Sequence, residues 1–406
     1  STANIAAVGA LGALVGQPFD INSYVTDRPW DTGFPLGVTL NYVDNVAMRR
    51  DIDSLLGRLQ AAGRYNPALD IPAADRYQQQ EQILAAYAMA RVETGPLTAV
   101  GGVRVERYLM NNSGTVVAGG GGTPLALKSS KTDFFPSLNL KYAVGDRVAL
   151  RLAGQRSVSR PAYGAIRVGA SIDDTASPGR ITGGNPALRP EYTWGLDASV
   201  EYYLPGNGMI SVAGFHRWVE DVLYQSQAVV GSDFYDFGGV DRSAYLLSGT
   251  YNGRSGKLYG VEFNLLKQFD FLPGALGGFG FQGNVTLLDG DFDTPTEKNI
   301  AFQGMSKRIA NASLFFEKHG ISARVSYQWR SSWLDTLGGF GSGEFRKGYE
   351  NLDVSLRYAL NENLTLFADL ANLTDETYIA YQGTPATPTE VEQIGARYLF
   401  GVRFAF

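Results

Sequence analysis

The chain has 406 residues, including 49 glycines, 22 tyrosines and 22 phenylalanines, and only 18% of its residues are charged. It contains no cysteine, which excludes disulfides, thiol catalysis and cysteine-based metal sites. The two histidines, His216 and His319, are far apart in sequence, so we expect no metal site and no cofactor. The formal net charge of −5 argues against nucleic acid as a partner.

Any membrane-spanning segments must be strands, because no apolar run approaches the ~18 residues that a transmembrane helix requires. An aromatic, glycine-rich and charge-poor composition is typical of a β-barrel with many turns. The sequence does not begin with methionine, and no basic segment followed by an apolar core marks a signal peptide. We therefore expect the chain to begin inside a longer or processed protein.

Residues 1–78 contain one helical pattern. In DNVAMRRDIDSLLGRLQAAG (44–63), apolar side chains recur at helical spacing, at Val46, Ile52, Leu55, Leu56 and Leu59. We predict a short amphipathic helix in an extracellular loop region that comprises 1–78. A helix that binds a partner is the alternative.

From residue 79 to residue 406 the dominant pattern is two-residue alternation. In ISARVSYQWR (321–330), Val325, Tyr327 and Trp329 fall on one face, and Arg324, Ser326 and Gln328 on the other. We predict an all-β, antiparallel transmembrane barrel over 79–406. Its thirteen predicted strands lie near 79–93, 96–110, 134–144, 147–158, 191–204, 207–219, 256–271, 276–291, 305–317, 320–334, 348–360, 363–374 and 395–406.

A soluble β-sandwich with one wet face is the alternative, and three features argue against it. The predicted strands have about 11 to 16 residues, longer than the usual 5–6 and long enough to cross a bilayer at a tilt. The connections alternate between short and long, as in bacterial outer-membrane barrels. Aromatic residues end the apolar face on both sides, as two interfacial girdles: Tyr142, Tyr202, Phe269, Tyr358 and Phe404 at one end, and Trp194, Trp218 and Trp329 at the other.

The connection lengths also predict an orientation. Short turns near 95, 145, 206, 274, 319 and 362 should face the periplasm, and the long connections 111–133, 159–190, 220–255, 292–304, 335–347 and 375–394 should lie outside the bacterial cell. Thirteen is odd, whereas single-chain bacterial barrels have even strand numbers. We therefore expect at least one further strand, which is either missed in this prediction or not contained in these residues.

The last strand, RYLFGVRFAF (397–406), alternates throughout. One face should contact outer-membrane lipid, and the opposite face has Arg397 and Arg403. The lipid-facing row, which we predict to be the assembly signal, comprises Tyr398, Phe400, Val402, Phe404 and Phe406.

The inward faces of the predicted strands have many ions of both signs. Such ions require water or polar partners, so the lumen should be either wide and closed by a polar plug or filled with water. The inward ions are Arg104, Glu106, Lys141, Arg151, Asp197, Glu201, Glu262, Arg324, Arg330, Asp353, Arg357, Asp369, Arg397 and Arg403.

Six features taken together resemble TonB-dependent outer-membrane receptors, in order and with matching spacing over roughly residues 76–406. They are FFPSLNLKY (134–142), SVSRPAY (157–163), GNPALRPE (184–191), GVEFNLLKQFDFLPG (260–274), ANLTDETY (371–378) and the Phe-terminated last strand. Within this family, these motifs are similar to those of the large subgroup found in Xanthomonas and Caulobacter relatives.

This resemblance implies a 22-stranded barrel closed by an N-terminal plug, and import of scarce nutrients with energy supplied by TonB. It also implies that the barrel-assembly machinery recognises the C-terminal strand. Counted back from the end, our first predicted strand (79–93) would be the tenth. This strand should run toward the periplasm, because it ends at the short turn near 95, and that direction agrees with an even place. We identify neither a plug nor a TonB-contacting box in these residues, so we assign energy coupling to none of them.

Other local motifs favour structural roles. Arg189 lies between two prolines at a rigid strand entry, and the glycine runs 119–122 and 338–345 lack the helix and lysine of a phosphate site. His216 lies near Glu220 and Asp221, a combination found in His/Asp outer-membrane proteases, but one histidine beside acids is far more often a surface residue. We therefore predict no catalytic residues and no enzyme. Loop aromatics and acids are the candidate ligand contacts, with plain loop packing as the alternative: Trp30, Asp31, Tyr235, Phe237, Trp333, Asp335 and Phe340.

The sequence therefore predicts an energised importer of a bulky nutrient, with a carbohydrate-type ligand favoured and a siderophore next. Two alternatives remain open. One is a passive channel of about fourteen strands, similar in size to the fatty-acid channel family, and the other is a surface adhesin or phage-binding barrel that transports nothing.

Overall fold

The computed structural model describes residues 16, 20–29, 39–66, 72–337 and 343–405. Four residues named above, Trp30, Asp31, Phe340 and Phe406, lie outside this part of the chain. Among the described residues no helix has the length and apolar character needed to cross a membrane.

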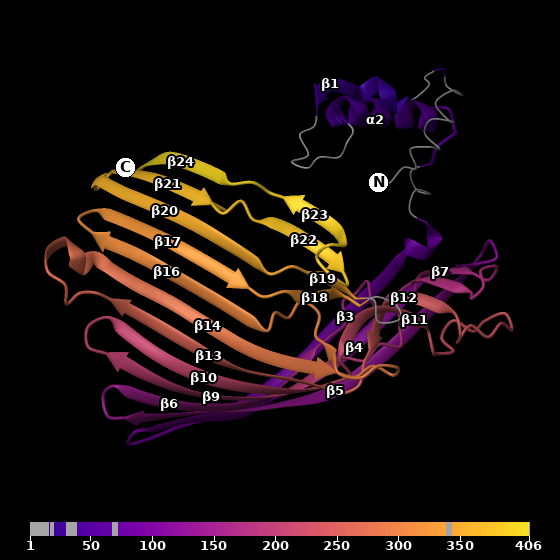
Figure 1. Cartoon of the computed structure of the whole chain (residues 1–406). Coiled ribbons are helices and arrows are strands. Elements are labelled where there is room, and N and C mark those ends of the chain that lie inside the picture. Colours follow the sequence, from indigo (N-terminus) through magenta and orange to yellow (C-terminus); the bar gives the residue numbers. More distant parts are fainter. Residues whose placement is uncertain (1–15, 17–19, 30–38, 67–71, 338–342, 406) are drawn as a thin grey trace.

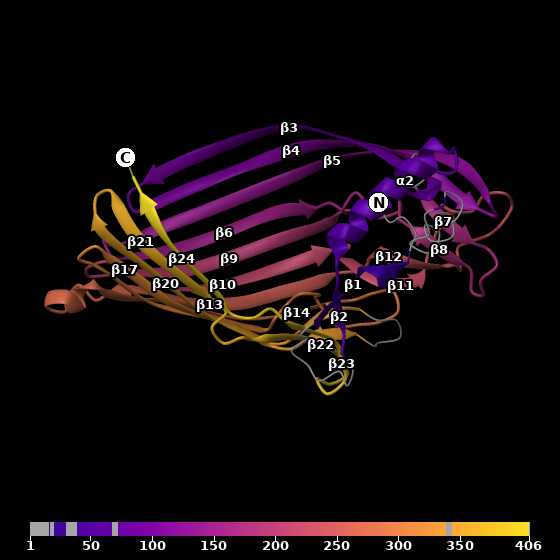
Figure 2. The ribbon, with the colours of Figure 1, turned by 90° about the horizontal axis from the view of Figure 1, so that it is seen from above.

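In the described part of the chain thirteen long strands form one antiparallel wall, which confirms the thirteen strands listed from the sequence and the all-β class (Figure 1). Figure 2 shows the wall curving around its long axis. The strands, in order along the wall, are β3 (Tyr77–Thr94), β4 (Leu97–Ala118), β5 (Gly121–Val144), β6 (Val148–Ser159), β9 (Glu191–Leu204), β10 (Gly208–Glu220), β13 (Gly256–Gln268), β14 (Phe279–Phe292), β16 (Arg308–Lys318), β17 (Ile321–Arg330), β20 (Tyr349–Asn361), β21 (Leu364–Ala371) and β24 (Arg397–Phe404).

The sheet has the topology of a barrel. Registers link each strand to the next from β3 to β24, and among the described strands no register joins β24 to β3. All six short connections lie where the sequence predicted them, and the longest of these contains the 3-10 helix η5 (Gly274–Gly278). The predicted alternation of short and long connections therefore holds except between β4 and β5.

The segment 111–133 was wrongly predicted to be a long loop. Here β4 and β5 continue their pairing as far as Ala118 and Gly121. Gly119 and Gly120 close the hairpin with φ of 55° and 80°, and two consecutive left-handed residues are what a tight two-residue turn needs. The glycine run therefore forms a hairpin turn, and β4 and β5 extend beyond the rest of the wall.

Short strands fill the other long connections, which the sequence predicted only as loops. β7 and β8 pair with each other, and β7 adds in parallel to β4 while β8 adds in parallel to β12. A separate four-stranded sheet has the order β18-β19-β22-β23. Their bounds are β7 (Ala170–Asp173), β8 (Arg180–Gly183), β11 (Leu223–Val229), β12 (Leu246–Asn252), β15 (Ile300–Ala301), β18 (Trp333–Thr336), β19 (Glu344–Arg346), β22 (Thr377–Gln382) and β23 (Pro388–Gln393).

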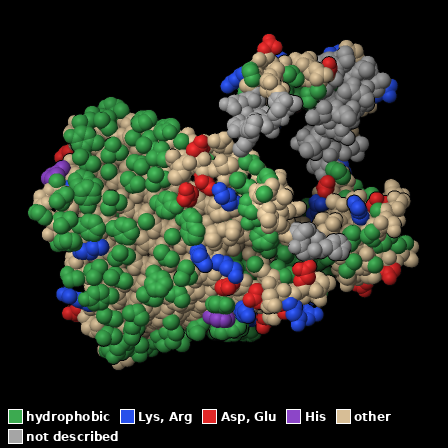
Figure 3. All heavy atoms as spheres, viewed as in Figure 1, with side chains coloured by type: hydrophobic (Ala, Val, Ile, Leu, Met, Phe, Trp, Pro, Cys, Tyr) green, Lys and Arg blue, Asp and Glu red, His purple; other side chains and the backbone are tan. Residues whose placement is uncertain are grey.

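One face of the wall is a broad apolar surface. Figure 3 shows hydrophobic side chains covering the part of the wall nearest the short turns, and charged side chains gathering toward the long connections. On β24 the predicted outward residues Tyr398, Phe400, Val402 and Phe404 are all at least half exposed. In register, Val402 lies beside Leu366 on the same face. This apolar, exposed band is what a lipid-facing surface requires.

The region before the wall contains the predicted helix, α2 (Asn45–Ala61). Asp44 caps it by accepting a hydrogen bond from the Ala47 backbone N–H, and Leu55 and Leu59 are buried as the helical spacing predicted. Val46, which we placed on the same face, is exposed. The other elements here are η2 (Ile21–Tyr24), β1 (Val25–Pro29), β2 (Asn41–Val43) and η4 (Ala73–Asp75). The extracellular position of 1–78 stays a prediction.

Candidate ligand-binding vestibule

The long connections pack around a buried core of their own. Val116 of β4, Ile181 of β8 and Leu247 of β12 are all almost fully buried there. Tyr235 has no exposed surface, and its hydroxyl donates a 2.6 Å hydrogen bond to the Gly184 carbonyl oxygen. These connections therefore pack together into a platform at the end of the wall opposite the short turns (Figure 1).

A first pocket of about 420 Å³ lies on one side of the segment 160–166. All the residues that line it are uncharged, and the polar ones are Tyr224, Gln225, Thr250 and Gln303. Gln225 donates to the Thr250 hydroxyl at 2.9 Å, and its backbone N–H donates to Gln303 Oε1 at 3.2 Å. This pocket offers amides and hydroxyls without a charge, and the Tyr224 ring beside them is buried against Tyr251 and Phe292.

A second, smaller pocket of about 160 Å³ lies on the other side of the same segment and is basic. Its lining includes Lys131, Arg160 and Arg189. Arg160 is paired with Glu106 at 2.8 Å and Arg189 with Asp221 at 2.6 Å, so their charges are largely compensated. Asn112 also lines this pocket, and its Oδ1 is buried without a hydrogen-bond partner among the described residues.

A buried arginine, Arg242, links two of the long connections that form the platform. Arg242 donates from Nε to Asp174 Oδ1 at 2.9 Å and from Nη2 to Oδ2 at 3.1 Å, and its Nη1 donates to the Tyr235 and Phe237 carbonyl oxygens. Tyr245 also donates to Asp174. The Arg242 guanidinium holds the pKa of Asp174 below its usual range, with a smaller contribution from Tyr245.

We expect the platform to loosen in acid. Because the pKa of Asp174 is lowered in the folded state, its stabilisation is present above the ordinary Asp pKa and is lost as the pH falls through the lowered value. Asp174→Asn should raise protease cleavage of 230–245 at pH 7 by about tenfold, the size of a charged hydrogen bond. Asp241→Asn, in the same loop, is the control, since Asp241 bonds only its neighbour Ser243. Equal cleavage of the two variants would contradict this role.

Inward charges of the wall pair across neighbouring strands. Arg151 binds Glu201 at 2.7 Å, and Arg357 binds Asp369 through two hydrogen bonds. Glu106 accepts from both Arg104 and Arg160. The lumen face is therefore polar, and ion pairs neutralise part of its charge, which suits a polar plug or water.

The candidate ligand residues that the structure describes line neither of these two pockets. Tyr235 and Trp333 are buried, and the Trp333 ring lies 3.7 Å from the Arg330 guanidinium carbon. The Phe237 ring lies beneath Arg242, at 4.6 Å, and Asp335 accepts from Arg346 at 3.3 Å. In this arrangement Tyr235 and Trp333 offer no free face to a ligand and support loop packing.

Sequence reasoning missed the residues that line the neutral pocket. Gln225, Thr250 and Gln303 are neither aromatic nor acidic, and they lie far apart in sequence. The available signal was a set of neutral amides in the long connections, which is too common to single out without the fold. Among the described residues no group of three His, Cys, Asp or Glu side chains is arranged to hold a metal ion.

A family model described as TonB dependent receptor-like, beta-barrel, matches residues 6–373. The chain belongs to this family, whose β-barrels lie in the outer membrane of Gram-negative bacteria. The resemblance and the predicted location are confirmed. The family is a class of receptors and transporters and not a class of enzymes.

Solved structures share the fold at low sequence identity. The ferric yersiniabactin uptake receptor FyuA from Yersinia pestis is 14% identical with a TM-score of 0.59, over 81% of this chain and 46% of that one. The copper transporter OprC is 17% identical with a TM-score of 0.59, over 81% and 48%. The ferric enterobactin receptor mutant from Pseudomonas aeruginosa, solved in complex with enterobactin, is 14% identical with a TM-score of 0.53, over 81% and 55%. The chain thus spans about half the length of these structures, and no curated protein matches it.

Proposed function

We propose that this chain forms part of an outer-membrane receptor that captures a bulky polar nutrient in the outer vestibule and imports it with energy supplied by TonB. The supporting observation is the neutral pocket beside segment 160–166, which the packed long connections form next to a polar lumen. A plug of the kind that the resemblance implies would face the paired ions of the wall.

A carbohydrate-type ligand is favoured. Uncharged amides and hydroxyls suit a ligand with many hydroxyl groups. A siderophore is the second candidate, because the smaller pocket is lined by Lys131, Arg160 and Arg189 and similar folds include receptors named for ferric siderophores. The two candidates differ in which pocket they need.

We expect the double variant Gln225→Ala with Gln303→Ala to lower affinity for an oligosaccharide ligand by about 10–100-fold, since each lost hydrogen bond contributes about 1 kcal/mol and an unsatisfied partner adds to this. Calorimetric titration of the purified receptor with oligosaccharides of increasing length measures this. Gln227→Ala is the matched control, because Gln227 is exposed on the same strand outside the pocket. Unchanged oligosaccharide affinity, with ferric chelate binding lost in Arg160→Gln, would replace the carbohydrate proposal by a siderophore.

Uptake assays separate the proposed importer from its alternatives. Ligand-dependent growth should disappear when the TonB energy system is deleted. Growth that persists indicates a passive channel. Ligand or phage binding without any uptake indicates an adhesin-type barrel.

A further inference from the structure

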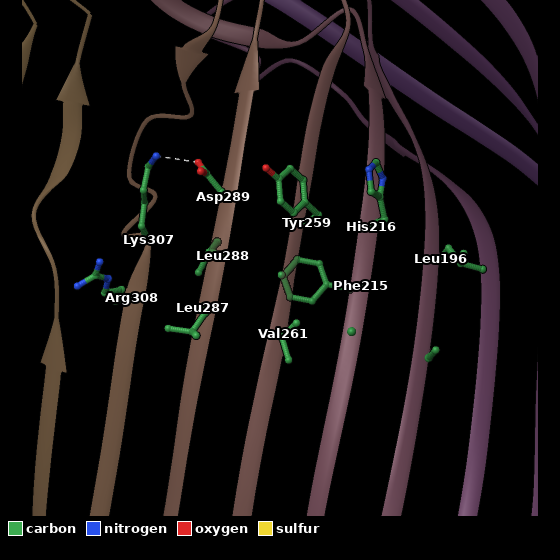
Figure 4. Close-up of a pocket in the computed structure, with 13 residues that line it drawn as sticks. Leu196, Phe215, His216, Tyr259, Val261, Leu287, Leu288, Asp289, Lys307 and Arg308 are labelled. Carbon is green, nitrogen blue, oxygen red and sulfur yellow. Dashed lines mark ion pairs between the residues drawn. The ribbon is translucent and has the colours of Figure 1, made fainter.

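The outer surface of the wall contains a groove of about 670 Å³ that crosses β9, β10, β13, β14 and β16 (Figure 4). The small outward residues Ala198 and Gly214 form its floor. Apolar side chains of Leu196, Val261 and Leu287 border it. The groove lies outside the lumen and outside the vestibule, so the proposed import function does not use it.

Polar side chains gather at one end of this groove. Lys307 Nζ lies 2.8 Å from Asp289 Oδ1. Arg308 lines the groove beside them, and no hydrogen bond or ion pair of its guanidinium is found among the described residues. The His216 ring stacks against Tyr259 with 5.8 Å between centroids, and the Nδ1 atom of His216 is buried without a partner among those residues. Figure 4 shows these side chains on neighbouring strands.

The polar end lies at the outer edge of the apolar band. Trp218, the next outward residue of β10 toward the long connections, contacts His216 with 4.1 Å between ring centroids. Trp329 pairs in register with Ala310, the next outward residue of β16 after Arg308. Tryptophan and tyrosine collect at membrane interfaces, and the long connections of bacterial barrels lie outside. The groove therefore leads from the outer interface into the apolar zone of the outer leaflet.

We propose that this groove binds one phosphorylated, acylated lipid of the outer leaflet. One acyl chain lies over Ala198 and Gly214, and the phosphate accepts charge-assisted hydrogen bonds from Lys307 and Arg308. Asp289 holds Lys307 in position, and two cations with one carboxylate leave one net positive charge at the headgroup level. An acyl chain matches the apolar part and an anion matches the unpaired cation, which is why we assign a phospholipid-type occupant.

Native mass spectrometry of the purified chain tests the headgroup half of this proposal. The probe is a diphosphorylated, acylated glucosamine lipid, compared with its dephosphorylated form in the same detergent. We expect the wild-type protein to retain the phosphorylated lipid about tenfold better, and Lys307→Gln with Arg308→Gln to lose this preference. Arg147→Gln is the control, because Arg147 is exposed in a short turn at the opposite end of the wall. Equal retention of both lipids by the wild type would overturn the proposal.

A second variant tests the acyl half. A Cβ atom added at Gly214 would meet only the Gly260 carbonyl oxygen, at 3.8 Å, an ordinary contact. Gly214→Leu should therefore fill the floor of the groove without disturbing the strand, and lipid retention should fall about tenfold while heat-modifiable mobility stays normal. Val212→Leu, on the same face of β10 outside the groove, should retain the lipid. Full retention in Gly214→Leu, or a dimer that depends on Arg308, would contradict this occupant.

Discussion

Val402→Arg is expected to block assembly of the protein in the outer membrane. Val402 is half exposed on β24, on the same face as Leu366 of β21, in the apolar band of the wall. A charge at this depth should cost about 2–4 kcal/mol. It also interrupts the row Tyr398, Phe400, Val402 and Phe404, which we propose the barrel-assembly machinery recognises. Heat-modifiable mobility in outer-membrane fractions measures the folded share.

Arg403→Gln is the matched control for this substitution. Arg403 neighbours Val402 but points to the opposite face, where it pairs in register with Thr365. Its replacement by a polar side chain should leave assembly nearly unchanged, because the lumen face already accommodates polar groups. Equal assembly of Val402→Arg and Arg403→Gln would mean that the assigned faces of β24 are wrong.

Tyr235→Ala should disrupt the outer platform while leaving the wall intact. Tyr235 has no exposed surface, and truncation of a buried aromatic side chain costs about 3–5 kcal/mol through lost burial and the cavity that remains. Limited proteolysis should therefore cleave 230–245 rapidly, whereas heat-modifiable mobility should not change. Local loss is expected because the Tyr235 core lies among the long connections and meets the wall at the outer ends of three strands, through Val116 of β4, Val219 of β10 and Phe292 of β14.

Two further variants make this result specific. Tyr235→Phe keeps the ring and loses only the hydrogen bond to the Gly184 carbonyl oxygen, so its effect should be about 1 kcal/mol. Tyr163→Ala removes an exposed tyrosine and should have no effect. Cleavage of Tyr235→Ala at the wild-type rate would show that the platform does not depend on this side chain.

The wall was predictable from sequence because one physical constraint governs each of its strands. A strand with lipid on one side and a polar lumen on the other must alternate apolar and polar residues. The polarity of each residue in β17 and β24 therefore predicts the face on which it lies. The short turns were predictable for the same reason, since alternation stops there. The predicted bounds therefore lie close to the observed ones for most wall strands, with β4 and β5 as the exceptions.

The outer part could not be predicted in the same way. Beyond the membrane, β4 and β5 keep pairing although GGGG appeared to be a loose loop. Loop aromatics such as Tyr235 and Trp333 looked like ligand contacts because composition cannot distinguish a buried ring from a presented one. The ion pair that stabilises the platform joins Asp174 to Arg242, 68 residues apart, and no local sequence pattern predicts such a pair.

The candidate site fails to appear in the sequence for a related reason. Gln225, Thr250 and Gln303 converge only because β11, β12 and the segment before β16 meet beside residues 160–166. Aromatic and acidic residues were chosen for their chemistry alone, and three of them, Trp30, Asp31 and Phe340, lie outside the described residues. Their role as ligand contacts stays a prediction.

Labelling of single cysteines in intact cells tests the central claim most directly, that the wall spans the outer membrane with its long connections outside. The chain has no cysteine, so each introduced thiol reports alone. Gln227→Cys in a long connection should react with a membrane-impermeant maleimide in intact cells. Asn207→Cys in a short turn should react only after the outer membrane is permeabilised. The reverse order, or equal labelling of both positions in intact cells, would contradict the proposed orientation and the vestibule built on it.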